Sequence, residues 1–282
     1  MKQFSGRVAA ITGAGSGIGR ALAKDLAGRG CHLALSDIDE EGLAETVARC
    51  EGAGIKVTSA RVDVADRTAM FGWADQAADE HGRVNLIFNN AGVAVVSAVE
   101  EQSYEDFEWL MNINFWGVVH GTKAFLPHLR ESGEGHVVNM SSVFGLISVP
   151  SQSAYNSAKF AVRGFTDALR MELEIEGAPV SATTIHPGGI KTNIVRNARI
   201  DNGPGALGGT PNAREAFDKM ALTSPEKAAR QILTAVANDR RRALIGPDAK
   251  VIDLVSRMPG GFYQRLLVKG ARRRSQSGGD NT

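Results

Sequence analysis

The sequence has few cysteines and no pattern typical of a metal site. Only two of its 282 residues are cysteines, Cys31 and Cys50, and they do not form a C-x-x-C pair. This excludes a disulfide scaffold and a cysteine-based zinc site, and it predicts a reducing compartment. The six histidines also lack metal-ligand spacing, so no bound metal is expected. His186 is the one histidine with a candidate role, and packing at a strand end is the simpler interpretation for it.

Long hydrophobic runs are also missing. No apolar stretch reaches 18 residues, and residues 1–6 contain no hydrophobic segment. The pattern therefore predicts neither a transmembrane helix nor a signal peptide, and we expect a cytoplasmic protein. No internal repeat or low-complexity linker divides the chain. Because 43% of the residues are hydrophobic and the net charge is only +1, one α/β domain with a substantial core is the simplest interpretation.

Short strand-like runs alternate with helical stretches along the chain. The predicted strands are Arg7–Thr12, Cys31–Ser36, Ile55–Val62, Val84–Asn89, His136–Met140, Val180–His186 and Ala243–Ile245. Such alternation is typical of a parallel sheet that is covered by helices on both faces. We therefore predict an α/β, doubly wound (Rossmann-type) single domain with a mainly parallel seven-stranded sheet.

The first strand-like run leads into the glycine-rich segment Gly13-Ala14-Gly15-Ser16-Gly17-Ile18-Gly19, and a helical pattern follows. Glycines let the backbone approach a pyrophosphate, and the first turn of a helix offers unpaired N–H groups. The spacing is G-x-x-x-G-x-G rather than the usual dinucleotide pattern G-x-G-x-x-G. It predicts a phosphate-binding turn, and the alternative is a tight strand-helix junction without a ligand.

Asp37 stands at the carboxyl end of the second predicted strand, about 20 residues beyond the glycines. An acidic side chain there can accept both hydroxyls of an adenosine ribose, and it repels a 2′-phosphate. Neither Ser16 nor Ile38, the neighbouring positions, supplies a positive charge. The sequence therefore favours NAD over NADP, although Asp37 could alternatively only open the turn before the next helix.

Tyr155 and Lys159 are four residues apart at the start of a predicted helix, so their side chains should share one face. An ammonium group about 5 Å from a phenol favours the phenolate by roughly two pKa units at an effective dielectric constant of about 20. This pair predicts that the pKa of Tyr155 is low enough for acid–base catalysis near neutral pH. The alternative is a surface helix that carries both residues by chance.

Further motifs occur between and after these segments. They are Asp63-Val64, Asn89-Asn90-Ala91-Gly92, Asn114 within Asn112-Ile113-Asn114-Phe115-Trp116-Gly117, Ser141-Ser142, and Pro187-Gly188 with Ile190 and Thr192. In this order, the motifs of the chain resemble those of the classical short-chain dehydrogenases/reductases from about Ser5 to Gly246. The resemblance implies NAD as cofactor and a small-molecule alcohol or ketone as substrate.

The resemblance also implies a role for each motif. The implied catalytic residues are Asn114, Ser142, Tyr155 and Lys159. The implied cofactor-binding residues are Gly13, Ser16, Gly17, Ile18, Gly19, Asp37, Asp63, Val64, Asn90, Ala91, Gly92, Tyr155, Lys159, Pro187, Gly188, Ile190 and Thr192. Tyr155 would exchange the proton that accompanies hydride transfer, Ser142 would hydrogen-bond the substrate oxygen, and Asn114 could anchor a water that links Lys159 to solvent. Without Tyr155, both Ser142 and Asn114 would be read as ordinary buried polar residues.

The segment after the last motif should hold the substrate. Residues 193–224 are rich in glycine, proline and small residues, which is typical of a mobile lid. Apolar residues are expected to line the pocket and to favour a hydrophobic substrate: Val93, Val95, Val96, Phe144, Leu146 and Ile147. Cofactor and substrate would thus share one catalytic domain over residues 1–247.

The carboxyl end departs from the family pattern. Residues 250–274 include seven basic and one acidic residue, a net charge of +6. Two apolar patches on either side of Pro259-Gly260-Gly261 predict two short amphipathic helices within a basic extension, residues 248–274. Packing against the catalytic domain or a partner subunit is favoured, and attachment to an anionic membrane surface is the alternative. Nucleic-acid binding is disfavoured because stacking aromatic residues are few. Residues 275–282 are expected to be disordered.

The leading functional hypothesis is an NAD-dependent oxidoreductase that interconverts a secondary alcohol and a ketone. One alternative is an NADPH-dependent reductase of 3-oxoacyl thioesters, against which Asp37 argues. An alternative of another class is a non-catalytic nucleotide-binding sensor or scaffold, which should have lost part of the tetrad or of the glycine turn. The resemblance further implies a homotetramer or homodimer, assembled through the helices at residues 104–129 and 153–176.

Overall fold

The computed structural model describes residues 3–52, 54–192, 194, 198–200, 222–259 and 261–278. Its core is a sheet of seven strands, all of them parallel. The strands are β1 Val8–Thr12, β2 His32–Asp37, β3 Val57–Arg61, β4 Leu86–Asn89, β6 Gly135–Met140, β7 Val180–Pro187 and β9 Arg242–Ile245. Every strand predicted from the sequence is present, within a few residues of its expected bounds. The predicted single-domain α/β fold is confirmed.

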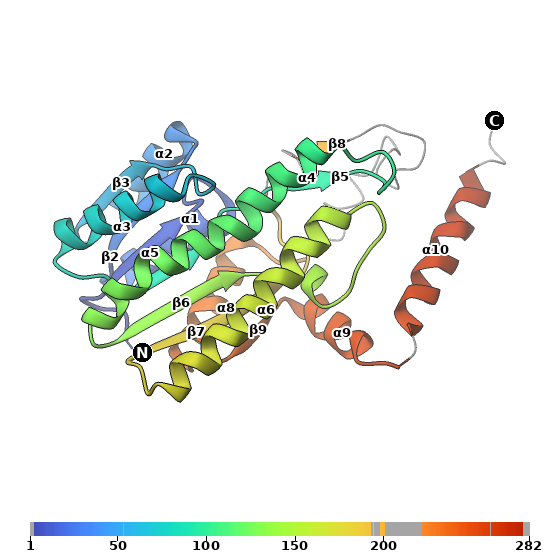
Figure 1. Ribbon diagram of the computed structural model, residues 1–282. Helices are drawn as coiled ribbons and strands as arrows, with labels where there is room; N and C mark the ends of the chain where they lie inside the picture. The colour runs from blue at the N-terminus through green and yellow to red at the C-terminus, as the bar shows by residue number, and fades with distance from the viewer. Residues whose placement is uncertain are drawn as a thin grey trace.

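Helices cover both faces of the sheet (Figure 1). One face carries α1 Gly17–Gly28, α2 Glu40–Cys50 and α8 Pro225–Ala237, and the other carries α3 Arg67–His81, α5 Gly117–Glu131 and α6 Ser153–Ile175. Successive residues of β1 point to opposite layers, with Ala9 and Ile11 in the first and Val8 and Ala10 in the second. Both faces of the strand are therefore buried, which explains why it is apolar without alternation.

The strand order is β3-β2-β1-β4-β6-β7-β9. The direction in which the chain adds strands reverses between β1 and β4, because the chain first builds outward to β3 and then returns to the other side of β1. In open parallel sheets, ligands bind in the crevice beyond the carboxyl ends of the strands at such a reversal. The loops after β1 and β4 are those that carry the glycine turn and the Asn89–Gly92 motif.

The long helix predicted from Tyr104 to Leu129 is interrupted. It consists of α4 Tyr104–Met111, a π-helical turn η1 Asn112–Trp116 and α5. A π-helical turn inserts one extra residue into the helix, and it often marks a functional position. The sequence shows no sign of it, because the apolar spacing continues through the turn and no proline or glycine stands inside it.

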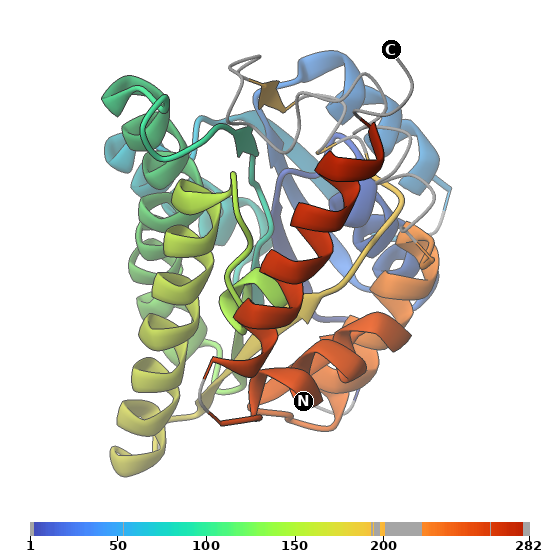
Figure 2. The same cartoon turned by 90° about the vertical axis from the view of Figure 1, so that its right-hand side faces the viewer.

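The basic extension forms two helices, α9 Pro247–Ser256 and α10 Phe262–Gly278. α9 packs under the end of β9, whereas α10 stands apart from the helical layers in Figure 1 and lies in front of the sheet in Figure 2. The predicted pair of helices is present, but α10 extends four residues into the segment that was expected to be disordered. Residues 279–282 and most of the predicted lid, residues 193–224, lie outside the described residues.

Two short strands, β5 Val95–Val96 and β8 Arg199–Ile200, pair outside the main sheet. They join the loop after β4 to residues 199–200, which belong to the segment that follows Thr192. Among the helices that the structure describes, none is both long and apolar enough to cross a membrane.

Candidate functional site

The glycine turn after β1 is a tight connection that side chains would obstruct. Gly13 and Gly17 have positive φ angles of 65° and 52°, which favour glycine. A Cβ atom at Gly19 would lie 2.0 Å from the Gly13 carbonyl oxygen. Helix α1 begins at Gly17, directly after the exposed Ser16, and its first turn contains no acidic residue. The turn can therefore present unpaired N–H groups and a positive helix end to an anion.

Asn90, at the end of β4, holds this turn in place. Its Nδ2 donates to the carbonyl oxygens of Thr12 and Gly13 at 2.9 and 3.1 Å. The Thr12 hydroxyl, almost fully buried, accepts hydrogen bonds from the N–H groups of Asn90 and Ala91 at 3.0 and 3.1 Å. The loops after β1 and β4 are thereby joined. Thr12 was not predicted as a functional residue, although it directly precedes the glycine turn.

Asp37 lies at the end of β2 with its carboxylate turned toward the glycine turn. One oxygen accepts from the N–H of Gly15 at 2.7 Å, and the other accepts from the N–H of Asp39 at 3.0 Å. A Cβ atom at Gly15 would lie only 2.8 Å from the first of these oxygens, so this position requires glycine. The two backbone bonds orient the carboxylate and leave each oxygen able to accept a further hydrogen bond.

Arg20 is the basic residue of α1 that reaches back to the glycine turn. Its guanidinium donates to the carbonyl oxygens of Gly15 and Gly42 and forms an ion pair with Glu45 at 2.6 Å. The charge of Arg20 is therefore already paired and its donors are already used. No local motif indicates this arrangement, because Glu45 lies on α2, 25 residues away in the chain.

The motif residues near the expected adenine and nicotinamide positions are also at the carboxyl edge of the sheet. Asp63 is exposed and caps its own turn by accepting from Ala65 N–H at 2.9 Å, whereas Val64 is buried. Gly92 opens the space between two predicted catalytic residues. A Cβ atom there would lie 3.2 Å from Asn114 Oδ1 and 3.7 Å from Lys159 Nζ.

The loop after β7 carries Pro187, Gly188, Ile190 and Thr192 to the opposite side of the crevice. Thr192 reaches the glycine turn, because a Cβ atom at Gly17 would lie 3.2 Å from its methyl group. Ile190 is buried and pairs with Thr223 in an isolated bridge. The loop after β7 therefore meets the glycine turn at the start of α1, where Ile18 is partly buried.

Asp248 holds the loop after β7 in place. It lies in the first turn of α9, and its carboxylate accepts from the N–H of Gly189 at 2.6 Å. A Cβ atom at Gly188 would lie 2.1 Å from the same oxygen, so the close approach requires glycine. Asp248 was not predicted as a functional residue. Its position follows from the packing of α9 beneath the loop, which no local motif reveals.

Tyr155 and Lys159 share one face of α6, as their spacing predicted. The Lys159 Nζ atom lies 5.4 Å from the centre of the Tyr155 ring. Lys159 is 3% exposed, and its ammonium donates to the Met140 carbonyl oxygen at 2.9 Å. Tyr155 is partly buried and hydrogen-bonds to Ser142. The structure thus brings three of the four predicted catalytic side chains together, between the end of β6 and the start of α6.

The predicted effect of Lys159 on the phenol is wrong. Burial raises the pKa of Tyr155 to about 12, and the hydrogen bond with Ser142 only partly opposes it. Burial also lowers the pKa of Lys159 to about 8. Removal from water disfavours the charged form of both groups. The proton therefore stays on Tyr155 at neutral pH.

The tyrosine titration should show this directly. The chain has three tyrosines, and tyrosine with an ordinary pKa of about 10 is about nine-tenths ionised at pH 11. With a pKa near 12, Tyr155 should remain largely protonated there, so the wild type and Tyr155→Phe should have nearly equal phenolate absorbance at pH 11. If the variant already lacks the phenolate absorbance of one tyrosine at pH 9, Lys159 lowers the pKa of Tyr155 and burial does not raise it. Circular dichroism at each pH would verify that the protein is folded.

Ser142 lies at the end of β6 and caps the short helix η2 Val143–Gly145. Its hydroxyl accepts from the N–H of Phe144 at 3.1 Å, and its carbonyl oxygen accepts from His186 Nδ1 at 2.8 Å. Since a carbonyl can only accept, His186 must carry its proton on Nδ1. Burial lowers the pKa of His186 to about 4, so the ring is neutral at pH 7. His186 therefore has a packing position that also fixes the serine backbone.

Asn114 occupies the π-helical turn and is fully buried. Its amide forms two hydrogen bonds with the backbone of Val93, at 2.8 Å to the N–H and 2.9 Å to the carbonyl. This pairing attaches η1 to the loop after β4, beside Gly92. Because one N–H of Nδ2 and one acceptor site of Oδ1 are used by Val93, any contact of Asn114 with a water near Lys159 has to use the second N–H, the remaining acceptor capacity of Oδ1 or the backbone.

Apolar residues surround the tyrosine as expected. The Phe144 ring meets the Tyr155 ring edge-to-face, with 6.1 Å between the ring centres. Val95, Leu146 and Ile147 are almost fully buried, so they support the wall more than they line it. In the part of the chain that the structure describes, no group of three or more side chains is arranged to hold a metal ion.

Comparison with known proteins identifies the family. The family model for short chain dehydrogenase matches residues 7–203. The protein SadH of Mycobacterium tuberculosis is 50% identical over 271 residues, which cover 96% of this chain and 97% of SadH. Estradiol 17-beta-dehydrogenase 11 of Macaca fascicularis is 37% identical over 204 residues, 72% of this chain and 68% of that protein.

A solved structure agrees with these relatives. A short chain dehydrogenase/reductase from Burkholderia phymatum, crystallised in complex with NAD, superposes with a TM-score of 0.84 and 33% sequence identity. The match covers 90% of this chain and 94% of that one. The resemblance seen in the sequence motifs is thus confirmed over nearly the whole length. The chain belongs to the short-chain dehydrogenase family and is an oxidoreductase with a Rossmann-type nucleotide-binding fold.

Proposed function

We propose that this protein uses NAD to interconvert a secondary alcohol and a ketone, with Tyr155 as the general acid and base. The observation that carries the proposal is the meeting of Tyr155, Ser142 and Lys159 beside the crevice at the strand reversal. An intact glycine turn and an intact tetrad are unexpected in a non-catalytic sensor. The relative named estradiol 17-beta-dehydrogenase 11 supports an alcohol as the reduced substrate.

The residues around the crevice fit a dinucleotide. The pyrophosphate would lie against the glycine turn, where added Cβ atoms at Gly13 and Gly19 would meet backbone atoms within 3 Å. The adenosine ribose would bond to the Asp37 carboxylate, whose oxygens keep acceptor capacity. Arg20 is paired with Glu45 and cannot neutralise a 2′-phosphate without losing that partner. These observations support NAD over NADP, and with it the alcohol dehydrogenase over the NADPH-dependent thioester reductase.

The chain's own residues would manage the proton. When bound, the nicotinamide supplies the site that accepts or donates the hydride at the carbinol carbon. In carbonyl reduction, Tyr155 would give its hydroxyl proton to the substrate oxygen, and in alcohol oxidation it would take that proton back. Ser142 would donate a hydrogen bond to the same oxygen as charge develops on it. A protonated Lys159 would stabilise the phenolate that remains after reduction.

The pocket side of Tyr155 favours an apolar substrate, because Phe144 lies against its ring. Exposed apolar side chains on α6 and on η1, directly before α5, also support assembly of several copies through these helices, as the resemblance implied. Phe160 and Met171 are 39% and 53% exposed, and Trp116, in η1, is 47% exposed. These three would be buried in a dimer or tetramer built on this face.

Cofactor choice can be tested by thermal unfolding. NAD⁺ should raise the melting temperature well above the rise that NADP⁺ gives, because a ligand stabilises only the folded state that binds it. Asp37→Ala should narrow that gap, since hydrogen bonds to a charged group contribute about 1.5–3 kcal/mol, or roughly 10- to 100-fold in affinity. Equal shifts with both cofactors in the wild type would contradict the NAD assignment.

Asp39→Ala provides a matched control for that variant. Asp39 caps α2 by accepting from the N–H of Gly42 at 3.1 Å, and it lies two residues from Asp37. Its removal costs a carboxylate and a helix cap, so the melting temperature without ligand should fall. The difference between NAD⁺ and NADP⁺ should stay as in the wild type, because the lost side chain bonds to Gly42 of α2 and the backbone N–H that bonds to Asp37 is kept.

A further inference from the structure

Helix α10 combines a strong positive charge with exposed apolar side chains. It contains five basic residues and no acidic one. The whole chain has 32 basic and 31 acidic residues, and only Asp280 follows α10, so the 261 residues before it carry a net charge of −3. The positive charge of the protein is thus concentrated on one terminal helix.

The two sides of α10 have different neighbours. Tyr263 Oη accepts from the N–H of Ser148 at 3.4 Å, and Gln264, Leu267 and Val268 line a groove of about 610 Å³ with the loop before α6. Phe262, Leu266 and Lys269 follow the i, i+4, i+7 spacing on the other side of the helix. Phe262 and Leu266 are 42% and 51% exposed.

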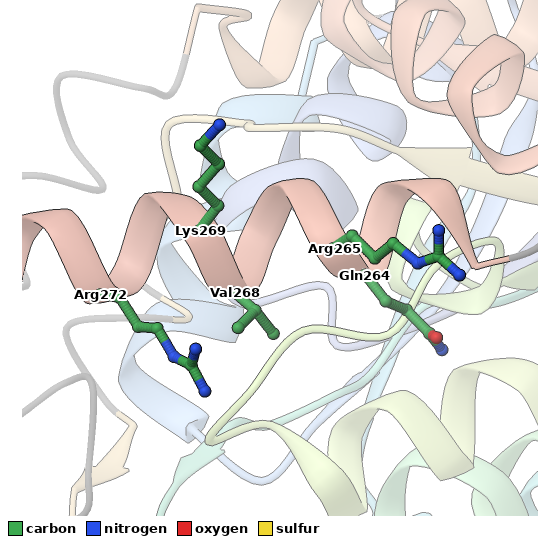
Figure 3. A pocket seen from close by; sticks show the side chains of 5 residues that line it. All are labelled: Gln264, Arg265, Val268, Lys269 and Arg272. Atoms are coloured by element: carbon green, nitrogen blue, oxygen red, sulfur yellow. The ribbon is translucent and has the colours of Figure 1, made fainter.

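The cations of α10 lie among these apolar side chains. Figure 3 shows Gln264, Val268 and Arg272 pointing to one side of the helix, while Lys269 points to the opposite side. A second hollow, about 430 Å³, runs along the helix and is lined by Arg265, Val268, Lys269 and Arg272 among others. Arg265 and Lys269 form no ion pair with any side chain that the structure describes. Their aliphatic stems can cover apolar surface while the charged ends remain available.

We propose that α10 docks this protein on an anionic lipid bilayer. Headgroup phosphates would pair with Arg265 and Lys269, the acyl boundary would receive Phe262 and Leu266, and Arg272 would add to the long-range attraction between the positive helix and the anionic surface. A protein partner would have to place an anion opposite each cation and an apolar pocket opposite each apolar side chain. An anionic bilayer offers charged headgroups and an apolar acyl region over its whole surface. α9 also exposes apolar side chains, since Val251 and Leu254 are 61% and 68% exposed.

Flotation of the full chain with vesicles tests the proposal. The protein should float with vesicles of phosphatidylcholine and phosphatidylglycerol but not with phosphatidylcholine alone, and added salt should release it. The variant Arg265→Gln/Lys269→Gln/Arg272→Gln should lose about a hundredfold in partitioning, at about fivefold for each cation removed. Phe262→Ser/Leu266→Ser should lose about tenfold or more.

A charge-matched control separates location from net charge. Lys24→Gln/Lys227→Gln/Arg230→Gln removes three exposed cations from α1 and α8, and it should bind vesicles like the wild type. Equal flotation of the wild type and the α10 triple variant, or no flotation of the wild type, would overturn the proposal. If Phe262→Ser/Leu266→Ser instead lowers the mass measured by light scattering, α10 is an interface between copies. Unchanged NAD⁺ melting shifts would show that the variants are folded and that the proposed function is a separate question.

Discussion

Replacing Tyr155 by phenylalanine should reduce kcat by about a thousandfold while NAD⁺ binding stays intact. Positioned acid–base groups contribute about 10²- to 10⁴-fold to catalysis, and the variant loses only the hydroxyl that exchanges the proton. The ring, its edge-to-face contact with Phe144 and its place beside Lys159 are kept. Steady-state kinetics with a panel of apolar secondary alcohols would measure the loss, and melting shifts with NAD⁺ would verify cofactor binding.

Tyr104→Phe is the matched control for this variant. Tyr104 begins α4 and is 88% exposed, so the same loss of a hydroxyl should leave kcat unchanged. If Tyr155→Phe retained more than about a tenth of the wild-type rate, proton exchange would have to go through another group, and the proposed mechanism would be wrong.

The second large effect is expected at Gly19. In Gly19→Ala the new methyl group would lie 2.0 Å from the Gly13 carbonyl oxygen and 2.7 Å from Asn90 Nδ2. The backbone of the turn must shift, and the hydrogen bonds from Asn90 to Thr12 and Gly13 must lengthen or break. We expect a loss of about 1–3 kcal/mol in the free energy of unfolding, as for other overpacked sites, together with at least about a tenfold loss in NAD⁺ affinity.

Gly72→Ala is the corresponding control, because it adds the same methyl group in open space. Gly72 lies within α3, and no atom lies within 4 Å of the position of its added Cβ. Alanine in a helix interior should stabilise the protein by about 0.5–1 kcal/mol and leave NAD⁺ affinity unchanged. Urea unfolding and calorimetric titration would measure both variants. A Gly19→Ala protein that binds NAD⁺ normally would contradict the proposal that the pyrophosphate lies against the glycine turn.

The features that the sequence predicted well depend on local spacing. Each buried strand has its own apolar run, and Tyr155 and Lys159 lie one helical turn apart, so the fold and the shared face of α6 follow from nearby residues. The glycine turn and Asp37 lie at the ends of neighbouring parallel strands, which meet at one edge of the sheet. Their proximity is thus implied by strand order alone.

The features that the sequence did not predict depend on three-dimensional packing. The pKa of Tyr155 is raised because the phenol is buried, and burial cannot be judged from spacing. Asp248 reaches the loop after β7 from α9, 59 residues further along the chain, and Arg20 is neutralised by a glutamate on another helix. Each arrangement joins segments that are distant in the chain and share no motif.

The central claim is that this protein moves a hydride between an alcohol carbon and NAD while Tyr155 handles the proton. Apolar secondary alcohols that carry deuterium on the carbinol carbon test it most directly, with mass spectrometry of the recovered cofactor. The account predicts one deuterium in the reduced cofactor formed by the wild type, and almost no reduced cofactor from Tyr155→Phe. Reduced cofactor without the label, or equal labelling by the wild type and the variant, would contradict it.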